Sequence, residues 1–333
     1  HLRICGVYPR LRARISPSVP RKFARVILGT DMDPESAFQD AMDCFTLCNF
    51  QECLKRLHSI NSADPQVRQK VELLTYRAYI AQRKYNVVIN EITENHEVLS
   101  YRLVRLLAGL QSGTASKTKV LEDLSANFSD NPFTSDETCI IITATIYMYL
   151  AMPEKALRFL HQGSTLYCDA LTVQCLLSIN RLDLANKTVR RMQVADEDAL
   201  PSQLASAAFY LIKGGDKLNE ALSIYQELQE KYKPTPLLLN GQAAALMAMG
   251  RWADAEPVLQ QSLDLEPSHT ETLINMMVAS QHTGKPAEIM SRFISQLRDC
   301  DKNHPFLDSI NSMDQLFEEA KSQIAARTQK NVK

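Results

Sequence analysis

Three cysteines, Cys44, Cys48 and Cys53, lie close together, and His58 follows them. Thiolates and imidazoles are common ligands of zinc. Cys44 and Cys48 are four positions apart, so on a helix they would share a face and could reach one metal ion. Cys53, however, occupies the small-residue position of a repeat described below, where side chains pack between helices. We therefore predict buried thiols at this cluster, with a zinc site as the alternative.

A second candidate is residues 109–119, GLQSGTASKTK, which superficially match a phosphate-binding loop. In such loops a glycine directly precedes Lys-Thr, so that the backbone can wrap around the phosphates. Here Ser116 precedes Lys117, and no strand is expected before the segment. The pattern therefore predicts a polar loop between helices at residues 111–119 and no nucleotide site.

The histidines and acids form no catalytic pattern. The chain has no G-x-S-x-G, G-x-G-x-x-G or H-E-x-x-H motif, the spacings that place a nucleophile, a dinucleotide or a zinc ion. Besides His1, six histidines are spread along the chain without ligand spacing: His58, His96, His161, His269, His282 and His304. We therefore expect neither an enzyme nor a protein that holds a cofactor or metal.

Composition favours a helical protein. Apolar residues make up 45% of the 333 residues and charged residues 23%, which is ordinary soluble usage. The ten glycines are too few for the many turns of a sandwich or propeller, and helix-forming residues fill the middle of the chain. No apolar run reaches the roughly 18 residues that a membrane span needs. The most apolar stretch, residues 140–152, predicts a buried helix.

Charge is distributed unevenly. Residues 1–31 carry seven basic residues and one acid, a net charge of +6, which leaves −7 on residues 32–333. The mildly acidic remainder argues against nucleic acid as a partner. We expect residues 1–31 to be a basic extension, disordered or non-native, with Met32 as a plausible native start. The alternative is an organelle-targeting peptide, which is also rich in arginine and poor in acids.

The informative signal is a repeat. An aromatic residue or leucine is followed after two residues by a small one, and after three more by a large apolar one, as at Trp252, Ala255 and Leu259. The spacing recurs at Leu218, Ala221 and Tyr225; Leu182, Ala185 and Val189; Tyr85, Val88 and Ile92; and Phe50, Cys53 and Leu57. Ala221 and Ala255 are 34 residues apart. A period near 34 is typical of tetratricopeptide repeats, each a helix–turn–helix unit.

The segment from Leu239 to Pro267 is the most complete unit. Ala243 and Ala255 are expected where its two helices cross, because only small side chains let the two backbones approach closely. Gly250 is expected to end the first helix, since glycine adopts positive φ without steric cost. Trp252 is expected to open the second helix and to fill the space between turns.

Four further units are predicted, at residues 34–63, 66–95, 201–234 and 268–305. Residues 100–195 are expected to be helical but irregular, because Ala156 and Ala185 are only 29 residues apart and one helix or turn must be shortened. The predicted fold class is all-α: a tetratricopeptide-like right-handed α-solenoid at residues 32–305. An amphipathic helix from about Asp308 to Arg327 is expected to cap it, within residues 306–333.

Stacked units share one core and curve, so the first helix of each pair lines a concave surface. Such a surface typically receives an extended segment or a helix of another protein. The predicted partner-binding residues are Ser206, Tyr210, Asn240, Ala244, Met247, Ile274, Val278 and Gln281. Because these residues are uncharged, they predict an apolar or mixed ligand.

A co-chaperone is the alternative for such a solenoid. Binding of chaperone tails requires a carboxylate clamp, in which a lysine and several asparagines occupy set concave positions. Asn275 stands at one such position, but Asn240 and Ala244 stand where a lysine and an asparagine are needed. The clamp is therefore incomplete, which disfavours a tetratricopeptide adaptor of the co-chaperone type.

Particular segments are more specific than the repeat. Residues 75–92 read TYRAYIAQRKYNVVINEI, residues 237–263 read LLLNGQAAALMAMGRWADAEPVLQQSL, residues 271–284 read ETLINMMVASQHTG, and residues 295–306 read SQLRDCDKNHPF. In this order and at these spacings, the chain resembles the epsilon subunits of coatomer. The resemblance extends from about Met32 to about Lys321.

The resemblance implies a function that the periodicity does not. Coatomer forms the COPI coat of vesicles in Golgi-to-ER and intra-Golgi transport. In this family the repeats close into a ring around a protruding segment of the alpha subunit, whose C-terminal region the epsilon subunit binds and stabilises. The resemblance thus implies a non-enzymatic structural subunit without a cofactor. It would be cytoplasmic and would associate peripherally, through the coat, with Golgi and vesicle membranes.

Overall fold

The computed structural model describes residues 33–129, 136–302 and 304–331. In these ranges the chain is helical, with no β-strand. The expected extension at residues 1–31 lies outside the described residues. No described helix is both long and apolar enough to cross a bilayer.

The helices follow one another with short connections. The N-terminal half comprises α2 (Pro34–Thr46), α3 (Phe50–Ser59), α4 (Pro65–Ala81), α5 (Tyr85–Glu91), α6 (Leu99–Gln111), α7 (Lys117–Ser129), α8 (Glu137–Tyr149), α9 (Pro153–Leu160) and α10 (Leu166–Ser178). The C-terminal half comprises α11 (Leu182–Asp196), α12 (Leu200–Lys213), the 3₁₀ turn η1 (Gly215–Leu218), α13 (Asn219–Tyr232), α14 (Pro236–Ala248), α15 (Trp252–Leu265), α16 (Thr270–His282), α17 (Ala287–Cys300) and α18 (Pro305–Asn331). The predicted all-α solenoid is confirmed.

The helices form pairs, from α2–α3 to α16–α17, and the turn inside each pair contains a residue with positive φ. Those residues are Cys48, Arg83, Gly113, Ala151, Asn180, Gly214, Gly215, Gly250 and Gly284. The left-handed conformation ends the first helix and reverses the chain. Four of the turns use no glycine. Three of the eight pairs lie in residues 100–195, the stretch that the sequence predicts to be irregular. That stretch is thus built from the same unit, with α9 shortened to 8 residues.

Small residues lie at the helix crossings, as predicted. Ala243 of α14 and Ala255 of α15 have no exposed surface. Trp252 opens α15 and is partly buried, with its ring stacked 3.8 Å from that of His282 on the next pair. The aromatic residue therefore joins two repeats.

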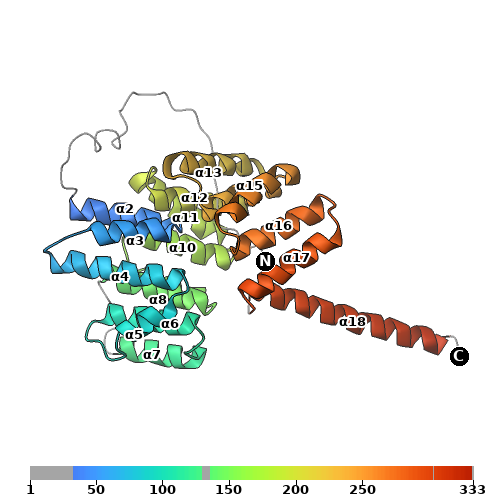
Figure 1. Cartoon of the computed structure of the whole chain (residues 1–333), viewed down its shortest axis with the longest axis horizontal. Helices are drawn as coiled ribbons and strands as arrows, with labels where there is room; N and C mark the ends of the chain where they lie inside the picture. The colour runs from blue at the N-terminus through green and yellow to red at the C-terminus, as the bar shows by residue number, and fades with distance from the viewer. Residues whose placement is uncertain (1–32, 130–135, 303, 332–333) are drawn as a thin grey trace.

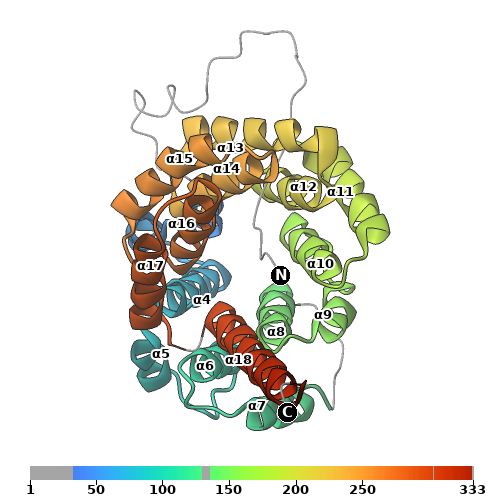
Figure 2. The same ribbon diagram turned by 90° about the vertical axis from the view of Figure 1, so that its right-hand side faces the viewer.

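The stack curves until its first repeats lie against later ones (Figure 2). In the α4–α5 turn, Arg83 donates from Nη1 to the carbonyl oxygen of Cys300, 2.9 Å away, and pairs with Asp301 at 3.7 Å. Gln39 of α2 donates to the Tyr167 hydroxyl of α10 at 2.6 Å. These contacts join residues more than 120 positions apart in sequence, so the described helices close into a ring.

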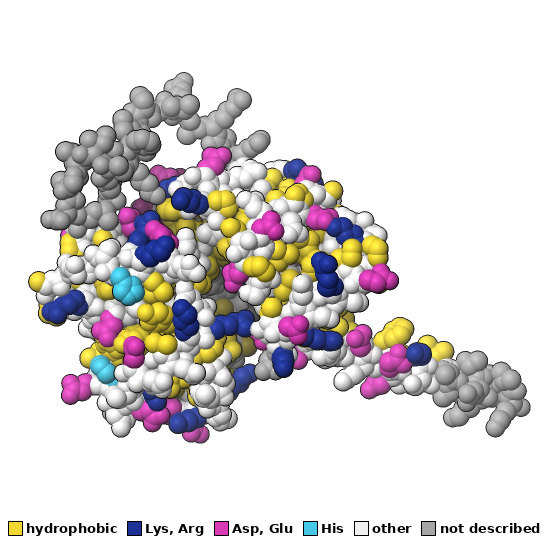
Figure 3. Space-filling model, viewed as in Figure 1, with side chains coloured by type: hydrophobic (Ala, Val, Ile, Leu, Met, Phe, Trp, Pro, Cys, Tyr) yellow, Lys and Arg dark blue, Asp and Glu magenta, His cyan; other side chains and the backbone are white. Residues whose placement is uncertain are grey.

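The final helix, α18, extends away from the ring (Figure 1). The buried Leu307 and partly buried Phe306, in its first turn, pack on the preceding repeats. Beyond this turn Met313, Leu316 and Phe317 are exposed, and hydrophobic side chains are visible on the protruding helix in Figure 3. The expectation of a helix here is confirmed, but Met313, Leu316 and Phe317 are not covered by the repeats as the first turn is.

Candidate partner-binding site

The predicted inner-wall residues lie on the first helices of their pairs, α12, α14 and α16. Five of the eight are buried by their own neighbours: Ser206, Asn240, Ala244, Met247 and Ile274. Tyr210 and Val278 are partly exposed, and Gln281 is exposed. These last three side chains therefore have the most surface to offer to a partner.

Asn240 is the centre of a buried polar network. Its Nδ2 atom lies 2.8 Å from the Pro236 carbonyl oxygen, 3.2 Å from Ser262 Oγ and 2.6 Å from Thr272 Oγ1. Its Oδ1 atom accepts a hydrogen bond from Asn275 Nδ2 at 3.0 Å. The network links α14, α15 and α16, so Asn240 and Asn275 hold adjacent repeats together. Asn275 therefore already has a partner, which does not favour its use in a carboxylate clamp.

Acidification is expected to destabilise the chain through His269, the N-cap of α16. Its Nδ1 accepts the Thr272 N–H and lies 2.8 Å from Thr272 Oγ1. Burial lowers the pKa of His269 below its ordinary 6.5, so the unfolded chain takes up the proton at a higher pH than the folded chain. The free energy of unfolding should fall as the pH drops from about 7.5 through about 6.5.

Urea unfolding at a series of pH values measures this effect. His269→Asn keeps an N-cap acceptor but does not titrate, so its stability should decrease less on acidification. Identical pH profiles for the two chains would show that His269 contributes nothing.

The predicted chemical clusters have structural roles. Cys53 is buried, Cys44 is partly buried and Cys48 is exposed at the left-handed turn after α2, so the expectation of buried thiols is wrong for Cys48. Among the described residues, no three potential ligands are grouped for a metal ion. The segment like a phosphate loop is the α6–α7 turn, and the loop is shorter than predicted because α6 includes Gln111 and α7 begins at Lys117.

The buried thiols are poor nucleophiles. Burial raises the pKa of Cys53 and of Cys175 to about 12 and that of Cys168 to about 11. At neutral pH these side chains are therefore protonated, whereas nucleophilic catalysis requires the thiolate.

A cavity of about 910 Å³ lies where the first two repeats meet the N-terminal ends of α8, α10 and α12. Its wall includes Phe38 and Met42 of α2, Leu73 of α4 and Ile141 of α8. These residues come from helices far apart in sequence, so ring closure creates the cavity.

Two acids of this wall, Asp43 and Glu137, accept hydrogen bonds from neighbouring side chains. Gln39 donates to Asp43 at 3.2 Å, and Tyr232 lies 3.4 Å from the same carboxylate. Thr165 donates to Glu137. Burial raises the pKa of Asp43 and of Glu137. The Asp43 carboxylate therefore links α2 to α13, and the Glu137 carboxylate links α8 to the N-cap residue of α10.

Arg77 of α4 also lines the cavity, and the sequence patterns did not single it out. It lies between Tyr76 and Ala78, which are both buried. An arginine between two buried residues is a usable sequence signal, but the 34-residue pattern gives this position no role.

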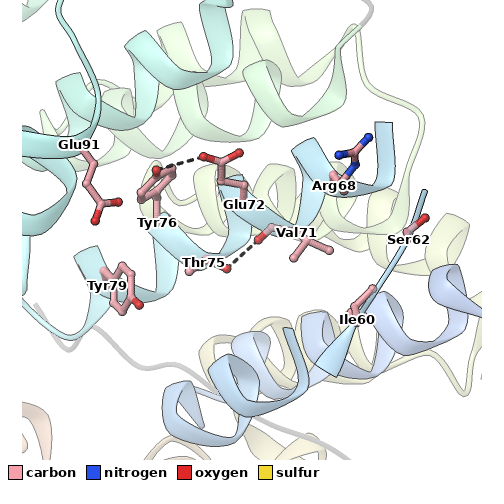
Figure 4. A pocket seen from close by; sticks show the side chains of 9 residues that line it. All are labelled: Ile60, Ser62, Arg68, Val71, Glu72, Thr75, Tyr76, Tyr79 and Glu91. Atoms are coloured by element: carbon pink, nitrogen blue, oxygen red, sulfur yellow. Dashed lines mark hydrogen bonds between the residues drawn. The ribbon is translucent and has the colours of Figure 1, made fainter. Parts of the chain in front are cut away.

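A second, smaller cavity of about 310 Å³ lies on α4 beside the α3–α4 connection and α5 (Figure 4). Figure 4 shows Tyr76 donating to Glu72, at a distance of 3.1 Å. Tyr101 of α6 donates to the other oxygen of Glu72 at 2.8 Å. Burial raises the pKa of both phenols, and the nearby Glu72 carboxylate raises it further. The same carboxylate joins α4 to α6. The polar side chains at this cavity therefore serve the packing of α4 against α6.

The stacked helix pairs place the chain among the tetratricopeptide-like solenoid proteins. A chain in the crystal structure of the APC/C hetero-tetramer Cut9–Hcn1 has a similar fold, with a TM-score of 0.57 at 12% identity. The match covers 85% of this chain and 56% of that one. At this identity the likeness concerns the fold alone.

Sequence comparison is more specific. The family model described as coatomer epsilon subunit matches residues 35–325, so the chain belongs to the coatomer epsilon subunit family. Coatomer subunit epsilon-1 of Arabidopsis thaliana is 34% identical over 276 residues, covering 83% of this chain and 93% of that protein. Coatomer subunit epsilon of Dictyostelium discoideum is 32% identical, covering 85% and 97%. The family resemblance seen in the sequence is confirmed.

Proposed function

We propose that this chain is a non-enzymatic structural subunit of the COPI coat that binds and stabilises the C-terminal region of the coatomer alpha subunit. In this role it serves Golgi-to-ER and intra-Golgi vesicle transport. It works in the cytoplasm and reaches Golgi and vesicle membranes peripherally, through the coat. The partner segment contacts the inner wall of the ring, including Tyr210, Val278 and Gln281.

The family match over residues 35–325 carries this proposal. Two physical features support it. A closed ring with a cavity of about 910 Å³ can surround a segment of a second chain. The clusters that could suggest catalysis are occupied by packing, turn formation or protonated thiols.

Co-expression tests the proposal. The chain and the C-terminal region of the alpha subunit from the same organism should elute together in size-exclusion chromatography. A partner present at 100 times its Kd should also raise the free energy of unfolding by about 2.7 kcal/mol. The N-terminal region of the same alpha subunit and a chaperone tail peptide are controls. Separate elution with no stabilisation would overturn the proposal, and binding of the tail peptide alone would favour the adaptor.

A further inference from the structure

The exposed apolar side chains of α18 repeat with the spacing of a coiled coil. Alternate steps of three and four residues separate Ile310, Met313, Phe317, Ala320 and Ile324, so these residues form one seam along the helix. Met313 and Phe317 are 71% and 68% exposed, and Ile324 is 64% exposed. The helix projects from the ring (Figure 1), and no repeat covers these three side chains. A second helix is the occupant that this spacing fits, because its side chains interlock with such a seam.

The charges beside the seam argue against a membrane surface as the occupant. Between residues 310 and 324, α18 exposes Asp314, Glu318 and Glu319 against one base, Lys321. Helices that lie on anionic membranes carry mainly lysine and arginine on the polar face. The seam therefore fits a protein helix better than a lipid surface.

One flank of the seam makes α18 complementary to itself. Asp314 and Lys321 are seven residues apart and each directly follows a seam residue, so they occupy equivalent heptad positions. When two copies of the helix lie antiparallel with Met313 against Ile324, this flank of one copy faces the same flank of the other. Asp314 of each copy then lies beside Lys321 of the other. The two-fold axis between the copies thus generates two identical ion pairs.

Other arrangements of two copies lose these ion pairs. A shift of one heptad in either direction brings Asp314 against its own copy or Lys321 against its own copy, and like charges repel. In a parallel pair, the flank of Asp314 faces the opposite flank, which carries Ser309, Leu316 and Gln323 and no charge. The antiparallel pair in the first register is therefore favoured.

Both charges are available in the single chain. Asp314 forms no ion pair with a described side chain. Lys321 lies 3.0 Å from Glu318 of the same helix, but this pair is well exposed and contributes little to stability. The lysine ammonium has three donors, so it can contact Glu318 and Asp314 of the second copy together.

We propose that two copies of this chain dimerise through an antiparallel coiled coil of their α18 helices. At the centre of the pair, Phe317 of each copy packs against Ala320 of the other, a large side chain against a small one. The two rings lie at opposite ends of the helix pair. The inference goes beyond the proposed function, because it concerns a surface outside the inner wall of the ring.

Analytical ultracentrifugation of the full chain over a series of concentrations tests the dimer. The wild type should change from monomer to dimer as its concentration rises. Phe317→Glu places a charge in the seam and should weaken dimerisation at least about tenfold. Gln315→Glu adds the same charge on the opposite, exposed face of α18 and is the matched control. Because Phe317 and Gln315 are both exposed, neither substitution should change the thermal midpoint.

Exchange of charges tests the antiparallel register. Asp314→Lys leaves two lysines on the flank and Lys321→Asp leaves two aspartates, so each variant alone should dimerise about five- to tenfold more weakly than the wild type. An equimolar mixture of the two variants should recover dimerisation, because each lysine then faces an aspartate. Dimers without this recovery overturn the antiparallel pair, and a wild-type chain that stays monomeric up to about 0.1 mM overturns the dimer itself.

The C-terminal region of the alpha subunit separates this surface from the inner wall. The wild type and Phe317→Glu should bind it with equal affinity. A monomeric wild type whose binding is weakened by Phe317→Glu would show that the seam receives the alpha subunit, which overturns the dimer while the proposed function stands. A chain that dimerises through α18 but does not bind the alpha region overturns the proposed function alone.

Discussion

Gly241→Ala is expected to lower the free energy of unfolding by about 3 kcal/mol, the upper end of the usual cost of overpacking a core. A Cβ at Gly241 of α14 would overlap the Cζ, Cε2 and Oη atoms of Tyr225. Tyr225 of α13 has no exposed surface and therefore no space into which to move. The gain of about 1 kcal/mol that alanine brings to a helix interior is too small to offset the clash. Urea unfolding followed by circular dichroism measures the change.

Two controls separate the clash from other effects of losing a glycine. Gly284 has a φ of +73° but open space around it, so Gly284→Ala should cost only about 1–2 kcal/mol of left-handed backbone strain. In a Tyr225→Leu background the shorter side chain makes room, and Gly241→Ala should then cost much less than in the wild type. Equal costs in both backgrounds would mean that the α13–α14 approach is not limited by these two residues.

Asn240→Leu is expected to destabilise the chain by about 2–3 kcal/mol, since hydrogen-bonding groups are left buried and unpaired. Leucine has a similar size, so packing is largely preserved. Asn275 loses its acceptor, and Ser262 and Thr272 lose a donor while remaining 2.9 Å from one another. Both of these hydroxyl residues have no exposed surface, so water cannot replace the lost bond.

A double-mutant cycle identifies the cause. Thr272→Val removes one of the buried hydroxyl groups, so Asn240→Leu should cost less in that background than alone, with a coupling of at least about 0.5 kcal/mol. The unfolding midpoint in urea is again the measurement. Additive effects would indicate that Asn240 stabilises α14 alone rather than the junction of three helices.

The repeat was predictable where its turns contain glycine. Gly250 and Gly284 are spaced by the period and adopt the positive φ expected of them. Ala151 and Asn180 adopt the same conformation in the stretch that the sequence predicts to be irregular. Those residues tolerate the left-handed region less readily than glycine. The packing of the flanking helices therefore imposes these turns, and the local sequence does not predict them.

The inner wall was predictable in register but not in exposure. The positions of Asn240 and Met247 on α14 follow from the period, yet both side chains are buried. Exposure depends on how closely adjacent pairs stack, which is decided by side chains about 30 residues away, such as Thr272 in contact with Asn240. Likewise, nothing near Asp308 in sequence shows that Met313, Leu316 and Phe317 of α18 stay exposed.

The sequence by itself determined the all-helical class, five of the eight described helix pairs and the family, because apolar spacing within a helix and small residues at each crossing are local properties repeated along the chain. The family resemblance implies a ring, but only the tertiary structure decided which residues close it, with Arg83 against Cys300 and Asp301. Closure is the sum of small rotations over many repeats, which no single window of sequence contains. The cavity between the first repeats and the ends of α8, α10 and α12 exists because of that closure.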